Sequence, residues 1–217
     1  MGYRTWAPGS GLRVPGLLFV MLLVVAASGR AAELGWSDVT VSLYHDGALA
    51  EADETKATAI AAAILAAADV TLHWAHCHAG VPSDARCARP LEPGELMLRL
   101  TRVERPTPRA AVLALGEALV TARGGAPALA TTVRLDRVDR LARHSGTDTI
   151  VLLGRAVAHE LTHLLTSDSR HATTGLMRPV WLASELACEH RADWTLDGAS
   201  VTAVRARTAA SMTLARG

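Results

Sequence analysis

The sequence predicts an α+β fold, a single domain of several short strands and several helices. Several short segments alternate apolar and polar residues, as half-buried strands do. Two longer segments repeat apolar residues at helical spacing, and loops containing proline or glycine separate the segments. With 217 residues, of which 50% are hydrophobic and 20% charged, the chain is long enough for one domain with a sizeable core.

The N-terminal segment has the layout of a secretory signal. Arg4 and Arg13 precede an unbroken apolar run, Leu17 to Ala27, and small residues follow the run. These eleven residues are too few to cross a bilayer, which takes about 20. We therefore expect a signal peptide over residues 1–31, with an uncleaved anchor as the alternative, and a single domain over residues 32–217.

The charge balance gives no reason to expect a polyanion partner. The formal net charge is +1, from 22 basic and 21 acidic residues. Arg4, Arg13 and Arg30 lie in the predicted signal segment, so 19 basic and 21 acidic residues remain after it, a balance of −2. We expect no nucleic-acid partner, no membrane association beyond the signal segment, and a monomer exported to the periplasm or the extracellular space.

Export makes a disulfide possible, and the chain has three cysteines. Cys77 and Cys87 flank a short loop-like stretch and are expected to pair, which leaves Cys188 as a free, buried thiol. The first of these cysteines also belongs to HWAHCH, residues 73–78, where three histidines suggest a second metal site. We disfavour that site because a strand turns alternate side chains to opposite faces, and because Cys77 is better used in a disulfide.

The first part of the mature chain alternates strand and helix patterns. Residues 39–45, VTVSLYH, alternate apolar and polar side chains and predict a strand. Residues 49–68 carry isoleucine and leucine at helical spacing, with acidic residues near the start, and predict a long helix. Two further strands are expected at residues 70–77, VTLHWAHC, and 95–103, ELMLRLTRV.

The second part begins with two apolar runs, residues 111–121 and 129–135, on either side of a glycine-rich turn. Both predict strands, and a short helix is expected at residues 136–142. A helix over residues 147–166 follows, with Thr147 or Asp148 as its N-cap. Two more helical pieces are expected at residues 181–190 and 197–212.

The helix predicted over residues 147–166 contains His159-Glu160-Leu161-Thr162-His163. Residues four apart lie about 40° apart around a helix, so the two imidazoles can bind one tetrahedral metal ion. Glu160 lies beside the first histidine, where its carboxylate can take a proton from a water molecule. The pattern therefore predicts a zinc site with Glu160 as the general base.

A catalytic zinc ion needs a third protein ligand and an open position. His171 lies eight residues after His163, and Asp168 lies five residues after it. Glu189 is the third candidate. It begins EHRAD, residues 189–193, and a glutamate with an aspartate four residues later resembles the ligand helix of gluzincin-type zinc peptidases.

The segment Ala158–Trp181 resembles the metzincin zinc endopeptidases, and most closely their matrixin-type branch. In that branch a third histidine, followed by a small residue, precedes a turn that contains a methionine. The resemblance implies His171 as the third ligand and Gly175-Leu176-Met177 as the methionine turn. Metzincins usually carry a glycine three residues after the second histidine and the third histidine three residues further on. Here Thr166 and Ser169 occupy those positions, and the histidine is displaced by two residues.

The longer loop is similar to that of exported bacterial matrixin-like proteins, in which a tryptophan follows the methionine as Trp181 follows Met177 here. The resemblance implies a metzincin-like fold: a small twisted mixed sheet packed with a long helix and an active-site helix, then a methionine turn and C-terminal helices. It also implies Zn²⁺ as cofactor and a peptide or protein substrate, held along an edge strand that we expect among residues 111–135.

Two alternatives to a metzincin endopeptidase stay open from the sequence. One is a catalytically silent, secreted metal-binding or interaction module on a peptidase fold. The other is a gluzincin-type peptidase with Glu189 as its third ligand. The intact Glu160 argues against the silent module, because a purely structural zinc site has no use for a base.

Overall fold

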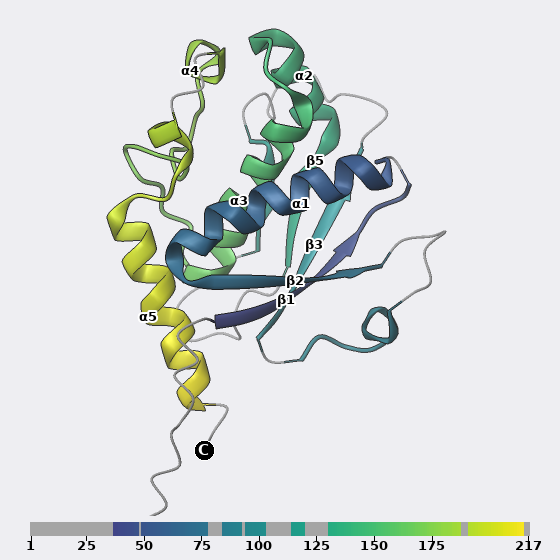
Figure 1. Cartoon of the computed structure of the whole chain (residues 1–217), viewed down its shortest axis with the longest axis vertical. Coiled ribbons are helices and arrows are strands. Elements are labelled where there is room, and N and C mark those ends of the chain that lie inside the picture. Colours follow the sequence, from purple (N-terminus) through teal and green to yellow (C-terminus); the bar gives the residue numbers. More distant parts are fainter. Residues whose placement is uncertain are drawn as a thin grey trace, which may run out of the picture. The chain divides into compact units, whose positions relative to one another are not determined.

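The structure is a computed structural model that describes residues 37–47, 49–77, 84–92, 94–102, 114–119, 130–187 and 191–214. The described residues form an α+β fold with a five-stranded, mostly parallel sheet (Figure 1). The predicted signal segment, residues 1–31, lies outside them, as do His78 and residues 188–190. Within the described part of the chain, no helix has the length and apolar character needed to span a membrane.

The sheet has the strand order β2-β1-β3-β5-β4. Its strands are β1 Ser37–Tyr44, β2 Val70–His76, β3 Glu95–Thr101, β4 Gly116–Ala118 and β5 Ala130–Arg134. β1 pairs in parallel with β2 and β3, and β3 pairs in parallel with β5. β4 runs antiparallel to β5 and forms one edge of the sheet. Parallel neighbours need a crossover connection, and α1 supplies it between β1 and β2.

The helices are α1 Glu51–Leu65, α2 Leu135–Ser145, α3 Thr149–Thr166, α4 Ala183–Ala187 and α5 Gly198–Leu214. Three short 3-10 helices, η1 Ala66–Ala68, η2 Ala85–Ala88 and η3 Arg191–Trp194, complete the described elements. α3 begins at the predicted cap, because the Asp148 carboxylate accepts hydrogen bonds from the backbone N–H groups of Ile150 and Val151 at 2.8 and 3.0 Å. The N-cap is thus Asp148 rather than Thr147.

The bounds of several elements differ from those that the sequence predicts. In the strand expected at residues 111–121, only Gly116–Ala118 form β4 among the described residues, because β4 pairs with no more than three residues of β5. The strand expected at residues 39–45 runs instead from Ser37 to Tyr44, and the imidazole of the next residue, His45, hydrogen-bonds to Glu54 of α1. Conversely, α2 extends to Ser145, three residues beyond the predicted end of that helix.

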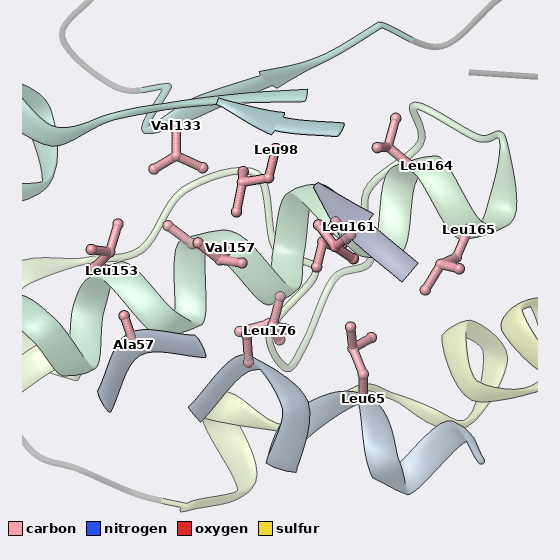
Figure 2. Close-up of a cluster of buried hydrophobic side chains, with 14 of the residues drawn as sticks. Ala57, Leu65, Leu98, Val133, Leu153, Val157, Leu161, Leu164, Leu165 and Leu176 are labelled. Atoms are coloured by element: carbon pink, nitrogen blue, oxygen red, sulfur yellow. The ribbon is translucent and has the colours of Figure 1, made fainter. Parts of the chain in front are cut away.

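The hydrophobic core lies around α3, between the sheet and α1 (Figure 2). Every residue of α3 from Leu152 to Leu165 is buried, so this helix has no solvent-exposed face over that range. Leu98 of β3 and Val133 of β5 approach it from the sheet, and Leu65 approaches it from α1. The HExxH segment is therefore held on a rigid central helix.

Candidate metal centre

Three histidines lie close enough to hold one metal ion. His159 and His163 come from α3, and His171 comes from the loop that follows it. Their ligand atoms lie within 4.8 Å of one another, and the two Nε2 atoms on α3 are 3.1 Å apart. Zinc–nitrogen bonds of about 2.0–2.1 Å place tetrahedral ligand pairs about 3.4 Å apart, so small side-chain rotations would close the site. His171 is exposed, which leaves one side of the group open.

Backbone carbonyl groups fix the orientation of both α3 imidazoles. His159 Nδ1 donates to the carbonyl oxygen of Leu176 at 2.9 Å, and His163 Nδ1 donates to that of Asp168 at 2.7 Å. Because a carbonyl only accepts, each Nδ1 carries the proton and each Nε2 keeps its lone pair. Two lone pairs 3.1 Å apart cannot satisfy each other, whereas a cation between them would satisfy both.

Burial keeps these imidazoles in the neutral form that metal binding requires. Desolvation lowers the pKa of His159 to about 4, although the hydrogen bond to Leu176 opposes the shift. Desolvation also lowers the pKa of His163 and that of His171. A neutral imidazole is a metal ligand, and an imidazolium is not. The donor set therefore fits a divalent metal ion such as zinc.

Of the three candidate third ligands, the structure brings only His171 to the α3 histidines among the residues it describes. The Asp168 carboxylate instead accepts hydrogen bonds from the Arg170 guanidinium, at 2.8 Å from Nε and 2.7 Å from Nη2. These bonds lower the pKa of Asp168. Asp168 contributes its backbone carbonyl, as the acceptor for His163. Glu189, the gluzincin-type candidate, lies outside the described residues.

The loop that carries His171 starts with a left-handed residue. Ser167, the C-cap of α3, has φ 49° and ψ 40°. The N–H of Asp168 donates to the carbonyl oxygen of His163 at 3.2 Å. Thr166 occupies the position at which metzincins usually carry a glycine. The left-handed residue here is the next one, Ser167. The loop that carries His171 thus leaves α3 about one helical turn after His163.

The Gly175-Leu176-Met177 turn joins this loop to the C-terminal part of the chain. The N–H of Ala172 donates to the carbonyl oxygen of Met177 at 2.9 Å, which closes the segment just after His171. The N–H of Leu176 donates to the carbonyl oxygen of Thr195, also at 2.9 Å. Leu176 and Met177 are both buried in the core cluster. The turn therefore fixes both the acceptor for His159 and the backbone of the residue after His171.

Replacing Gly175 with Ala is expected to destabilise the turn by about 2–4 kcal/mol. Gly175 has φ +69°, and a Cβ there would lie 2.7 Å from the carbonyl oxygen of Thr195. Gly146→Ala is the matched control, because Gly146 has φ +71° and no atom within 4 Å of the added Cβ. It should cost only about 1 kcal/mol. Urea unfolding measures both, and equal losses would contradict a role for the close approach.

Two tryptophans support the imidazole of His159 from the side. Trp181 Nε1 donates to Leu176 O at 3.1 Å, the same oxygen that accepts from His159, and its ring meets the imidazole edge to face at 5.7 Å between centroids. Trp194 packs edge to face on Trp181 at 5.4 Å, and the Arg155 guanidinium stacks over Trp194 at 4.2 Å. This stack restricts the rotation of the His159 ring.

Glu160 is buried beside the edge strand. Desolvation raises the pKa of its carboxyl to about 7, with the nearby charge of Glu117 adding to the shift. The hydroxyl of Thr131 is 3.5 Å from Glu160 Oε2 but 3.0 Å from the carbonyl oxygen of Glu117, so its single proton favours the carbonyl. A Cβ on Gly116 would come within 2.6 Å of the Glu160 side chain. Only glycine at this position of β4 leaves room for the carboxylate.

These residues open into a cleft of about 940 Å³. β4 and its flanking residues line one wall, and α2 and α3 line others. Residues 178–181, which follow the methionine turn, complete the lining. The sequence placed an edge strand for the substrate among residues 111–135, and β4 is the sheet edge in that range. The metal-binding histidines and Glu160 thus share one cleft with an edge strand.

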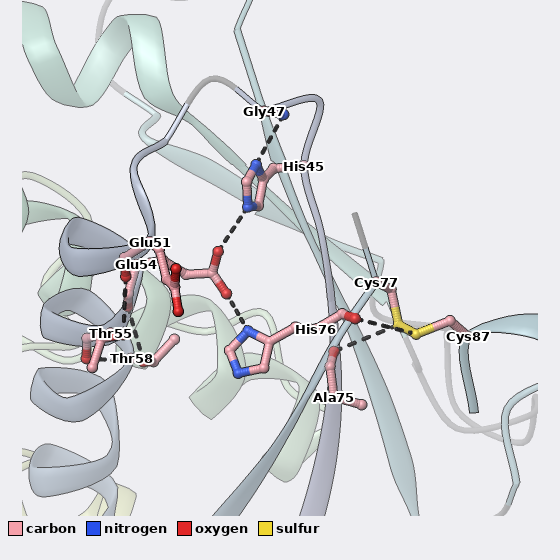
Figure 3. A network of polar contacts seen from close by, with 10 residues as sticks. All are labelled: His45, Gly47, Glu51, Glu54, Thr55, Thr58, Ala75, His76, Cys77 and Cys87. Carbon is pink, nitrogen blue, oxygen red and sulfur yellow. Dashed lines mark hydrogen bonds and ion pairs between the residues drawn. A yellow bond between two sulfur atoms is a disulfide. The ribbon is translucent and has the colours of Figure 1, made fainter. Parts of the chain in front are cut away.

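The histidines beside Cys77 contact carboxylates, and Figure 3 shows the contact of His76. His76 Nδ1 contacts the buried Glu54, whose other oxygen accepts from His45 Nε2 at 2.7 Å, whereas His73 contacts the exposed Asp38. The N–H of Gly47 donates to His45 Nδ1, so the proton of that ring lies on Nε2. The cluster ties the ends of β1 and β2 to the first turn of α1.

The predicted pairing of Cys77 with Cys87 is present as a disulfide. It joins the end of β2 to η2 across the loop between them. Cys77 is therefore not available as a metal ligand. Cys188, expected as a free and buried thiol, lies outside the described residues.

No family model matches this sequence, and no curated protein sequence matches it either. The functional conclusion therefore rests on the chemistry of the cleft.

The sequence did not predict three contributors to the chemistry of the cleft: Gly116, Thr131 and the cleft-facing side of α2. The glycine within a strand pattern was the one available signal, because such a glycine often marks a close approach.

Proposed function

We propose that this protein is a zinc-dependent endopeptidase of the metzincin type, related in its site to the matrixin-like branch. The observation that carries the proposal is the convergence of His159, His163 and His171 in one cleft with Glu160. Three imidazoles with an open side are the ligand set of a catalytic zinc ion, whereas structural zinc sites are closed by four protein ligands. A carboxylate beside that ligand set has a catalytic use and no structural one.

The supporting features extend beyond the ligands. An antiparallel edge strand, β4, lies at the cleft, and a buried methionine follows the third histidine in a tight turn. An extended peptide can add to such an edge through main-chain hydrogen bonds, which suits a substrate of varied sequence. The exposed apolar side chains of Leu119 and Val180 line the same cleft and can pack against substrate side chains.

In this mechanism His159, His163 and His171 would hold a zinc ion, which when bound would supply a Lewis acid for the scissile carbonyl and for water. Glu160 accepts a proton from the attacking water and passes it to the departing amine as the C–N bond breaks. Gly116 leaves space for the carboxylate, and the Thr131 hydroxyl lies 3.5 Å from it. β4 orients the peptide so that its carbonyl faces the water that Glu160 activates.

Metal analysis and cleavage together test the proposal. The chain, purified after export from a secreting host, should contain about one zinc ion and cleave members of a mixed peptide library. Treatment with 1,10-phenanthroline should remove both zinc and activity, and added Zn²⁺ should restore them, because the ligands are neutral imidazoles that release and rebind the ion. A protein that holds no zinc and takes none up would contradict every metal-dependent function.

A further inference from the structure

One stripe of α2 lines the cleft beside α3. Arg137, Arg140, Leu141 and His144 all line it. Arg140, Leu141 and His144 follow Arg137 by three, four and seven residues. This spacing places all four side chains along one side of the helix. Two arginines and one histidine of α2 therefore line the cleft.

The acidic residues of α2 do not neutralise this stripe. Asp136 lies 3.4 Å from the Arg134 side chain, and Asp139 pairs with Arg102 of the segment after β3. Neither aspartate lines the cleft. Two carboxylates do line it, Glu117 and Glu160, but neither pairs with an arginine of α2 among the described residues.

The arginines of the cleft differ in what they already bind. Arg137 Nη1 donates to the carbonyl oxygen of Ala114 at 2.6 Å, which fixes this side chain near β4. Arg178 is paired with Glu185. Arg140 is exposed and forms no hydrogen bond or ion pair with any residue that the structure describes. Its guanidinium therefore keeps its donors for a ligand.

We infer that Arg140 binds a carboxylate of the substrate on the α2 side of the cleft, with Arg137 adding positive charge beside it. This inference rests on the proposed function only in taking the occupant of the cleft to be a peptide. A guanidinium offers planar paired donors that match a carboxylate. The carboxylate can belong to an Asp or Glu side chain or to the peptide's free C-terminus.

Three matched series of peptides distinguish these sources. The first series carries one Glu at successive positions and an amidated C-terminus. The second series replaces that Glu with Gln, and the third keeps Gln but has a free C-terminal acid. Cleavage is measured with the zinc-loaded wild type, and binding by fluorescence anisotropy with the zinc-loaded Glu160→Gln variant. Both are repeated with Arg140→Gln and with the control Arg143→Gln, an exposed arginine of α2 that does not line the cleft.

We expect the Glu peptide, at one position, or the free-acid peptide to be favoured over its neutral counterpart by about threefold to tenfold. Arg140→Gln should remove this preference and leave the neutral peptide unchanged, whereas Arg143→Gln should alter neither. The preference should also weaken with added salt. An equal effect of Arg140→Gln on charged and neutral peptides, or no charge preference at any position, would overturn the inference.

The outcomes separate this inference from the proposed function. Cleavage without a carboxylate preference would support the proposed peptidase function and contradict the role of Arg140. Arg140-dependent binding of the acidic peptide without any cleavage would support the role of Arg140 and contradict the peptidase function. A protein that neither binds nor cleaves any of the peptides would contradict both.

Discussion

Replacing Glu160 with Gln is expected to lower peptide cleavage by about 100-fold to 10,000-fold while the zinc content stays unchanged. Gln has the same size and fits beside Gly116, so the packing at β4 is retained. It cannot accept a proton from water, so the reaction loses its base. Cleavage of a fluorogenic peptide measures the first effect, and metal analysis of the purified variant measures the second.

Glu51→Gln serves as the control for this substitution. Glu51 is an exposed carboxylate on the first turn of α1, outside the cleft lining. Its replacement should leave cleavage within about twofold, because exposed charges away from the site contribute little. Equal inactivity of the wild type and Glu160→Gln would favour the silent metal-binding module. Equal activity of the two would remove Glu160 from the mechanism.

Replacing His171 with Ala is expected to weaken zinc binding more than about 100-fold, because two imidazoles remain where three bound the ion. The thermal stabilisation that zinc gives should fall with the affinity. A ligand present at 100 times its Kd stabilises the folded state by about 2.7 kcal/mol, and most of this should disappear at the same zinc concentration. Competition with a chromophoric chelator measures the affinity, and calorimetry measures the stabilisation.

Asp168→Ala is the matched control on the same loop. Its carboxylate pairs with Arg170, and the backbone carbonyl that accepts from His163 survives the substitution. Zinc affinity should therefore change by no more than about threefold. Glu189→Ala should also leave it unchanged. A loss of zinc in Glu189→Ala and not in His171→Ala would instead establish the gluzincin-type ligand set.

The helix-borne half of the site could be predicted from the sequence because its geometry is local. The 3.6-residue period of a helix fixes the angle between His159 and His163 whatever surrounds them. Other local patterns predicted an N-cap at Thr147 or Asp148 and the order of strands and helices. The short loop between Cys77 and Cys87 likewise limited the distance between these two residues.

The other half of the site depends on contacts between distant parts of the chain. The proximity of His171 follows from the turn at Gly175, which is held by the carbonyl oxygen of Thr195. The acceptor for His159, at Leu176, is 17 residues away. No local period specifies such pairs, because a loop's path is set by the hydrogen bonds and packing that it finds in the folded chain.

The sequence by itself determined the metal-binding chemistry, since residue type and helical spacing decide which atoms can coordinate and where a base can stand. Only the tertiary structure decided the cleft. It packed β4 next to Glu160, where Gly116 leaves room for the carboxylate, and it turned the arginine stripe of α2 toward the cleft. The periodicity of α2 shows that a stripe exists, but which side faces the cleft depends on how α2 packs against the rest of the fold.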